Sequence, residues 1–288
     1  MMSISNPVAR LLMIAVACLV AAPVDLAVAQ IDRDIEFKID TKVYFGDSKE
    51  SAIENKTIFS QGLIFDFPLA AGNAFPDEVL VYDSNQKTIS LLDLKRQLQL
   101  KLLDVQLKKM VEGVRQQMAT DDRSRAMLEQ TFEEKIDTEK SLLTLTGDQD
   151  MTYQLHGQKP ESDRILSAYF EFLDVFTRVQ ITDPKKLPPF ARLRLNESIR
   201  RVGWIPDRVD INVSENAFFP EPFKARTEHK LTLAVTERDR SEIALAKKSW
   251  AVLPEVSLTK YRGLVEKKNF FERASEKAKR EQPVTPTN

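Results

Sequence analysis

The side chains that most often bind metals are scarce in this sequence. His156 and His229 are its only histidines, and neither has the spacing of a zinc motif such as H-E-x-x-H around it. Each lies in a segment whose apolar and polar residues alternate, so we expect a sheet histidine with ordinary hydrogen bonds in both cases. The sequence therefore predicts no metal site.

Nucleophilic and phosphate-binding motifs are missing as well. The single cysteine, Cys18, lies in an N-terminal apolar run, and no serine stands in a G-x-S-x-G turn. The chain has only eight glycines in 288 residues, and none forms a glycine-rich phosphate loop. We expect no catalytic residue of these kinds and no cofactor.

Acidic residues are numerous, but the pairs 121–122 and 133–134 and the cluster 237–239 are typical of helix caps and solvated helix faces. An acid–base hydrolase would need two carboxylates that the fold brings together, and it stays an alternative. The two tryptophans are too few for a sugar-stacking cluster. The net charge of −1, with positive and negative residues evenly mixed, argues against nucleic acid as a partner.

The N-terminus carries the pattern of an export signal. Arg10 precedes the apolar run LLMIAVACLVAA, and Ala27-Val28-Ala29 forms an A-x-A cleavage site. We therefore predict a signal peptide at residues 1–29 and a periplasmic or extracellular protein; an uncleaved N-terminal anchor is the less favoured alternative. No later stretch reaches about 18 apolar residues, so we expect no transmembrane segment in the mature chain.

Strand signals dominate the first third of the mature chain. Residues 35–45 alternate strictly, with Ile35, Phe37, Ile39 and Val43 on one face. Four or five further strands follow with little between them in residues 53–103, which indicates an antiparallel meander. Strands are also expected near residues 142, 153, 210 and 230.

Helical spacing begins at Leu103, and we predict two successive helices, residues 104–119 and 123–136, as a helical insert at 104–136. One continuous helix over 91–118 is the alternative. An amphipathic helix with an aromatic face is predicted at 164–181, and further helices at 188–203 and 236–250. We treat residues 31–262 as a single α+β domain, followed by a charged helix and disordered tail at 263–288.

The segment GLIFDFP, followed by DEVLVYDSNQKTISLLDLKRQ, carries a family resemblance. Residues 35–102 resemble the outer-membrane lipoprotein carriers of the bacterial envelope, the LolA-like and LolB-like proteins. That resemblance implies a long antiparallel sheet curled into a half-barrel around apolar side chains, with helices over the open side. The helical insert departs from the family plan, and no lid or lipid-contact residue of the family can be carried over.

The leading functional hypothesis is a non-catalytic binding protein that carries an apolar ligand, a lipid or a lipidated partner such as a lipoprotein. Sixteen phenylalanines support it, and a cavity on the curved sheet would hold the ligand. The phenylalanines expected to face it are Phe59, Phe65, Phe67, Phe172 and Phe176. A structural or protein-interaction component of the cell envelope is the alternative, with the helical insert and the C-terminal helix as its docking surfaces.

Overall fold

A computed structural model describes residues 35–70, 73, 75–120, 125, 128–147, 151–183, 186, 188–215 and 222–263. The chain divides into the units Met1–Gln30 and Ile31–Asn288, and every described residue lies in the second. The predicted signal peptide and nearly all of the predicted C-terminal helix and tail fall outside the described residues. Within those residues, no helix has both the length and the apolar character needed to cross a membrane.

The predicted α+β class with one antiparallel sheet is confirmed. Eleven strands pair in the order β6-β5-β4-β3-β2-β1-β11-β10-β9-β8-β7, and the sheet does not close on itself. The strands are β1 (Phe37–Phe45), β2 (Ile53–Ser60), β3 (Leu63–Ala70), β4 (Glu78–Asp83), β5 (Thr88–Asp93), β6 (Leu98–Leu103), β7 (Phe132–Asp137), β8 (Leu142–Gly147), β9 (Met151–Gln158), β10 (Ile205–Val213) and β11 (Phe223–Thr232).

Short hairpins build each half of the sheet. The β2–β3 turn consists of Gln61 and Gly62, both with positive φ (55° and 76°), as a two-residue hairpin with the twist of its strands requires. A Cβ atom at Gly62 would lie 2.7 Å from Nδ2 of Asn85, so a larger residue there would also have to displace that side chain. The two halves meet where β1 pairs with β11, Ile39 opposite Leu231.

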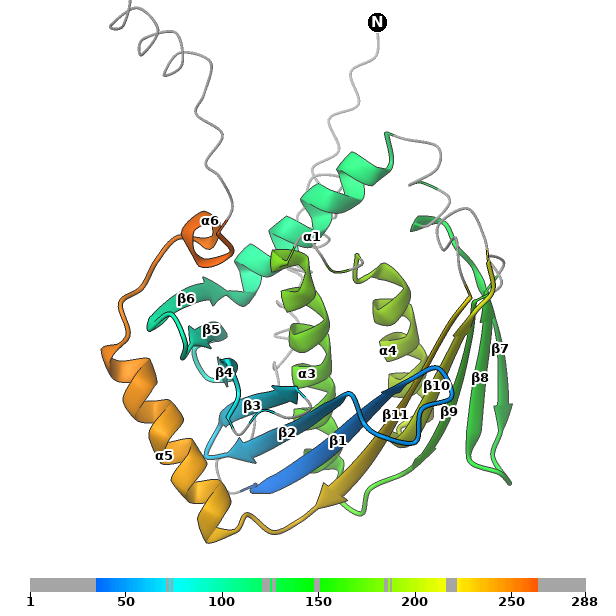
Figure 1. The fold of residues 1–288 in the computed structure, drawn as a ribbon. Coiled ribbons are helices and arrows are strands. Elements are labelled where there is room, and N and C mark those ends of the chain that lie inside the picture. The colour runs from blue at the N-terminus through cyan, green and yellow to red at the C-terminus, as the bar shows by residue number, and fades with distance from the viewer. Residues whose placement is uncertain are drawn as a thin grey trace, which may run out of the picture. The chain divides into compact units, whose positions relative to one another are not determined.

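Five helices pack on the sheet, together with the short 3-10 helix η2 (Gln180–Thr182). They are α1 (Asp104–Met118), α3 (Asp163–Val179), α4 (Phe190–Val202), α5 (Glu237–Val252) and α6 (Leu258–Tyr261). The sheet curves around α3 and α4, whereas α5 lies against its outer face (Figure 1). The main core thus lies on the concave side and a smaller one beneath α5.

The switch from strand to helix predicted near Leu102 is confirmed, because β6 ends at Leu103 and α1 begins at Asp104. The single continuous helix over 91–118 is therefore wrong.

The predicted second helix of the insert is wrong over its C-terminal part, since Phe132–Asp137 forms the edge strand β7. The sequence FEEKID also alternates, and this pattern places Phe132 against Tyr153 and Glu134 against Ser198 of α4. Pairing with β8 along six residues and these tertiary contacts override the helical spacing. Ile136, at the end of the expected helix, is 47% exposed.

An ion-pair network fastens α5 to the outer face of the sheet. The carboxylate of Asp239 lies 3.0 Å from Nζ of Lys38 on β1 and 3.0 Å from Nζ of Lys56 on β2. It also accepts hydrogen bonds from the backbone amide and hydroxyl of Thr236, the N-cap of α5. Burial alone would raise the pKa of Asp239, but these hydrogen bonds outweigh burial and hold that pKa below its usual range.

We predict that Asp239→Asn lowers the free energy of unfolding by about 3 kcal/mol at pH 7, because it leaves two lysines without their buried partner. A carboxyl with a lowered folded-state pKa stabilises the fold above its unfolded pKa of about 3.9 and ceases to do so as pH falls. The difference between wild type and variant in urea unfolding should therefore shrink below about pH 4.

Glu237→Gln is the matched control, because Glu237 lies in the same helical turn but its side chain is 96% exposed. It should change the unfolding free energy by less than about 1 kcal/mol. Equal losses in the two variants would contradict the role assigned to Asp239.

Candidate functional site

A cavity of about 530 Å³ lies between the concave face of the sheet and the helices α3 and α4. Its floor comes from β1 to β5 and β9 to β11, and its roof from α3, η2 and the start of α4. The cavity therefore spans the junction of the two halves of the sheet. This is the site with the strongest claim to function among the described residues.

Strand alternation makes the floor of the cavity. On β2, every second residue faces inward, so Ile53, Asn55, Thr57 and Phe59 all line the cavity. On β1, Ile39, Thr41 and Val43 do the same. The floor is thus apolar near α3 and carries small polar side chains further along the strands.

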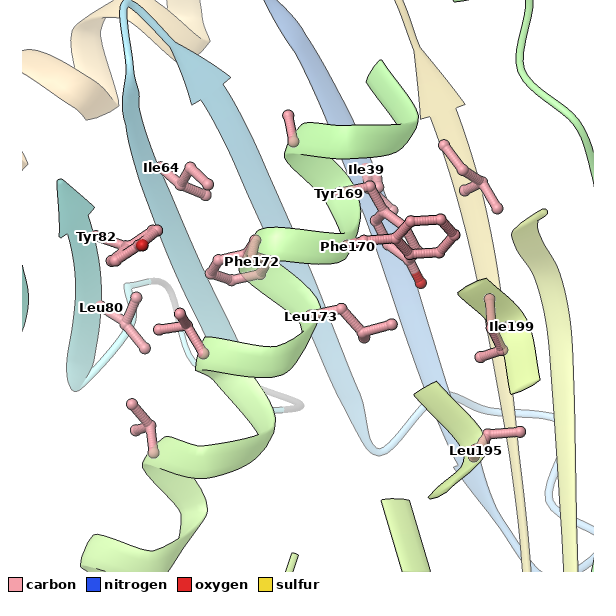
Figure 2. Close-up of a cluster of buried hydrophobic side chains, with 14 of the residues drawn as sticks. Ile39, Ile64, Leu80, Tyr82, Tyr169, Phe170, Phe172, Leu173, Leu195 and Ile199 are labelled. Carbon is pink, nitrogen blue, oxygen red and sulfur yellow. The ribbon is translucent and has the colours of Figure 1, made fainter. Parts of the chain in front are cut away.

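The aromatic face of α3 makes the roof. Phe172, Leu173 and Phe176 line the cavity from this helix. Figure 2 shows Phe172 pointing from α3 toward the β3 and β4 side, while Leu173 points toward α4. Nine of the seventeen residues of α3 are buried, so this helix packs against the protein on both of these sides.

Three of the five phenylalanines expected to face a ligand line this cavity. Phe59, Phe172 and Phe176 form a chain of ring contacts, with centroids 5.7 Å apart for Phe59 and Phe172 and 5.6 Å for Phe172 and Phe176. Phe37 stacks on Phe59 at 4.0 Å and holds that ring in place from the neighbouring strand. The three rings come from two elements far apart in sequence.

Phe65 and Phe67 were expected beside them, and here the expectation needs correction. Both lie on the outer face of β3, where Phe65 is fully buried and Phe67 packs against the same cluster under α5. The reason is the period of a strand: Asp66 lines the cavity, so its two neighbours must face the other way. Because residues of both faces in GLIFDFP are apolar, the sequence does not show which face of this strand points toward the cavity.

Asp66 is a buried carboxyl in the cavity wall. Its Oδ1 accepts hydrogen bonds from the hydroxyl of Thr57 at 2.6 Å and the amide of Asn55 at 2.7 Å. Burial raises the pKa of Asp66 to about 6, and these two hydrogen bonds oppose the rise only in part. Asn55 Oδ1 is buried and has no hydrogen-bond partner in the described structure.

Glu78 lines the same region of the cavity, but other groups engage its carboxylate. It accepts a hydrogen bond from the hydroxyl of Tyr261 at 2.7 Å and one from Arg262 at 3.1 Å. Those contacts tie α6 and the residue after it to β4. Glu78 therefore serves to hold the fold together at the rim of the cavity.

His229, on β11, lies between two threonines. Its Nδ1 is 2.9 Å from the hydroxyl of Thr41 and its Nε2 is 2.9 Å from the hydroxyl of Thr227. Burial and, to a smaller extent, the positive charge of Arg192 together lower the pKa of His229 to about 3. The imidazole is consequently neutral at physiological pH and too weak a base for proton abstraction.

Three further polar residues of the wall are Tyr153 on β9, Tyr169 on α3 and Arg192 on α4. The tyrosines are only 6% and 7% exposed. Burial raises the pKa of both, that of Tyr169 to about 12, while the charge of Arg192 acts in the opposite direction on each. None of the three was predicted from sequence. The arginine in PFARLRL, for example, has the same pattern around it as an arginine on a solvated helix face.

A second hollow, of about 320 Å³, lies between the C-terminal part of α1 and α4, and it is far more polar. Its cations already have partners: Arg178 contacts Asp104 at 2.6 Å, and Arg200 contacts Asp174 at 2.8 Å. This hollow is a network of satisfied ion pairs. Across the part of the chain that the structure describes, no cluster of three His, Cys, Asp or Glu residues could hold a metal ion.

A comparison with protein-family models finds no match to this chain, and a comparison with curated proteins finds none either. The function is therefore argued from the geometry of the cavity.

We predict that Asp66→Asn changes how stability depends on pH. A carboxyl whose folded-state pKa lies above its unfolded value stabilises the fold when protonated, and this contribution is lost as pH rises through the folded pKa. The free energy of unfolding of the wild type, relative to the variant, should fall by about 3 kcal/mol between about pH 4 and pH 7. Chemical denaturation at closely spaced pH values measures it; a constant difference would show that Asp66 titrates normally.

Proposed function

We propose that this protein binds an apolar molecule in the cavity beneath α3. The observation that carries the proposal is the cavity itself: about 530 Å³, with a lining surface that is mainly apolar. Ligand sites in proteins typically measure about 300–1,000 Å³ and combine apolar walls with a few placed polar groups. A core serving only stability would be packed, because interiors hold few voids larger than a water molecule.

The curved, open sheet with helices inside it also agrees with the half-barrel that the family resemblance implies. On that basis the ligand we propose is a lipid, or the acyl group of a lipidated protein, and the protein would act as a carrier. The predicted signal peptide supports a role in the periplasm or outside the cell. The resemblance rests on residues 35–102, whereas the cavity also involves the second half of the sheet.

Binding is better supported than the acid–base hydrolase. Asp66 and Glu78 do line one cavity, but Glu78 is held by Tyr261 and Arg262 and is not free to activate water. His229 is neutral with both ring nitrogens engaged. The alternative of an envelope interaction protein is less well supported, since the last five residues of the expected helical insert, 132–136, belong to a strand of the sheet.

We predict that Ala191→Trp blocks binding. Ala191 lines the cavity from the first turn of α4, and an indole there would occupy space needed by the ligand. Displacement titrations with the fluorescent probe N-phenylnaphthylamine should show the dissociation constant rising about tenfold or more, a loss of about 1.4 kcal/mol in binding free energy.

Ala244→Trp is the matched control, the same substitution at an exposed position of α5 on the opposite face of the sheet. It should leave the affinity unchanged, and circular dichroism should show both variants folded. Native mass spectrometry of the wild type tests directly for a co-purifying apolar molecule and requires no substitution. No probe binding by the wild type and no co-purifying apolar molecule would refute the proposal.

A further inference from the structure

Arg192 is a cation on the wall of an apolar cavity, and no carboxylate of the described residues pairs with it. The cavity carries three acidic residues, Asp66, Glu78 and Asp183, yet none of the described residues forms an ion pair or hydrogen bond with the Arg192 guanidinium. Most other arginines around the concave core do have such partners, as Arg178 and Arg262 illustrate. An unpaired charge is costly where solvent is partly excluded, so a partner supplied by a ligand would relieve that cost.

Tyr153 and Tyr169 supply a second, independent observation. Both are more than nine-tenths buried and both line the cavity, but neither hydroxyl is hydrogen-bonded to any residue in the described ranges. Neither hydroxyl is among the fully enclosed polar atoms that lack a partner, so both stay open to a group in the cavity. The other large buried tyrosines instead bond to carboxylates of the protein: Tyr82 donates to Glu171 at 2.5 Å and Tyr261 to Glu78 at 2.7 Å.

These three residues converge on the cavity from three elements. Tyr153 comes from β9, Tyr169 from α3 and Arg192 from the first turn of α4. The charge of Arg192 is felt by both tyrosines and by His229, which places the guanidinium within electrostatic reach of all of them. The cavity thus has a donor-rich part at Tyr153, Tyr169 and Arg192, and an apolar part at Phe59, Phe172 and Phe176. Two other cations line it: Arg262, which pairs with Glu78, and Lys186, which is exposed.

The available donors favour one kind of ligand group. A guanidinium offers several N–H donors that match the two oxygens of a carboxylate or phosphate, and tyrosine hydroxyls add O–H donors. A cationic group would be repelled by Arg192, and an uncharged hydrocarbon would leave all of these donors unsatisfied. A free inorganic anion would leave the apolar part of the cavity empty.

Resting on the proposed function, we infer that the ligand is an amphiphile with a single anionic head, whose carboxylate or phosphate binds Arg192, Tyr153 and Tyr169 while its apolar tail lies along Phe59 and Phe172. Arg192 then anchors the head and fixes the direction in which the tail enters the cavity.

The test compares ligands that share a tail and differ in their head. Palmitate, hexadecyl phosphate and hexadecanol each compete with N-phenylnaphthylamine for the full-length mature protein. At least one of the anionic ligands should bind about tenfold or more tightly than the alcohol, as expected for a hydrogen-bonded charge pair. Which of the two binds more tightly identifies the head as carboxylate or phosphate.

Arg192→Met removes the charge and keeps much of the apolar stem. It should abolish the preference for an anionic head while leaving hexadecanol affinity within about twofold. Arg194→Met is the matched control on the same helix; its side chain is 60% exposed, pairs with Glu197 and does not line the cavity. It should keep the full preference. Tyr153→Phe combined with Tyr169→Phe should reduce the preference without eliminating it.

The outcomes separate the two proposals. If the wild type binds all three ligands equally, or if Arg192→Met retains the preference, the anchor is wrong and the apolar binding site stands. If hexadecanol, palmitate and hexadecyl phosphate all fail to displace the probe, the binding site itself is wrong and the anchor with it.

Discussion

The structure depends on a mismatch in width between a long curved sheet and the helices that cover its concave face. Eleven strands at about 4.8 Å spacing span roughly 50 Å. A helix with its side chains is only about 10–12 Å across, so α3 and α4 together cover less than half of that width. The aromatic side chains of α3 widen the covered part of the sheet, but each of them points to one side of the helix only. The space left over the junction of β1 and β11 is the cavity.

Much of this fold could be predicted from sequence, because strand alternation and turn residues are local signals. The strands of residues 35–103, the switch to helix at Asp104 and the amphipathic helix α3 all follow from spacing. The edge strand β7 could not be predicted in this way. Its pattern fits either element, and only the partner strand β8 and the contacts of Phe132 and Glu134 decide between them.

The candidate site was less accessible to sequence reasoning. Counting phenylalanines identified the aromatic roof but could not tell which face of β3 is inward, and so Phe65 and Phe67 were placed wrongly. The polar residues of the cavity were invisible for another reason. Nothing local distinguishes Arg192 from a solvated arginine, or Tyr153 from a core tyrosine; the distinction lies in the absence of a partner, which only the assembled fold reveals.

The unjoined edges of the sheet have a consequence for what the cavity can accommodate. A closed barrel has its radius fixed by strand number and stagger, because hydrogen bonds run around the whole ring. Here β6 and β7 are not paired with each other, and the β6 edge is partly covered by the chain around Pro254 and Val256 through hydrogen bonds to Gln99. The radius of curvature is therefore set by side chains resting against the helices. Such a sheet can flatten slightly without breaking a single strand pair. We therefore expect the protein to select its ligand less by the width of the apolar tail than by the chemistry of the head group.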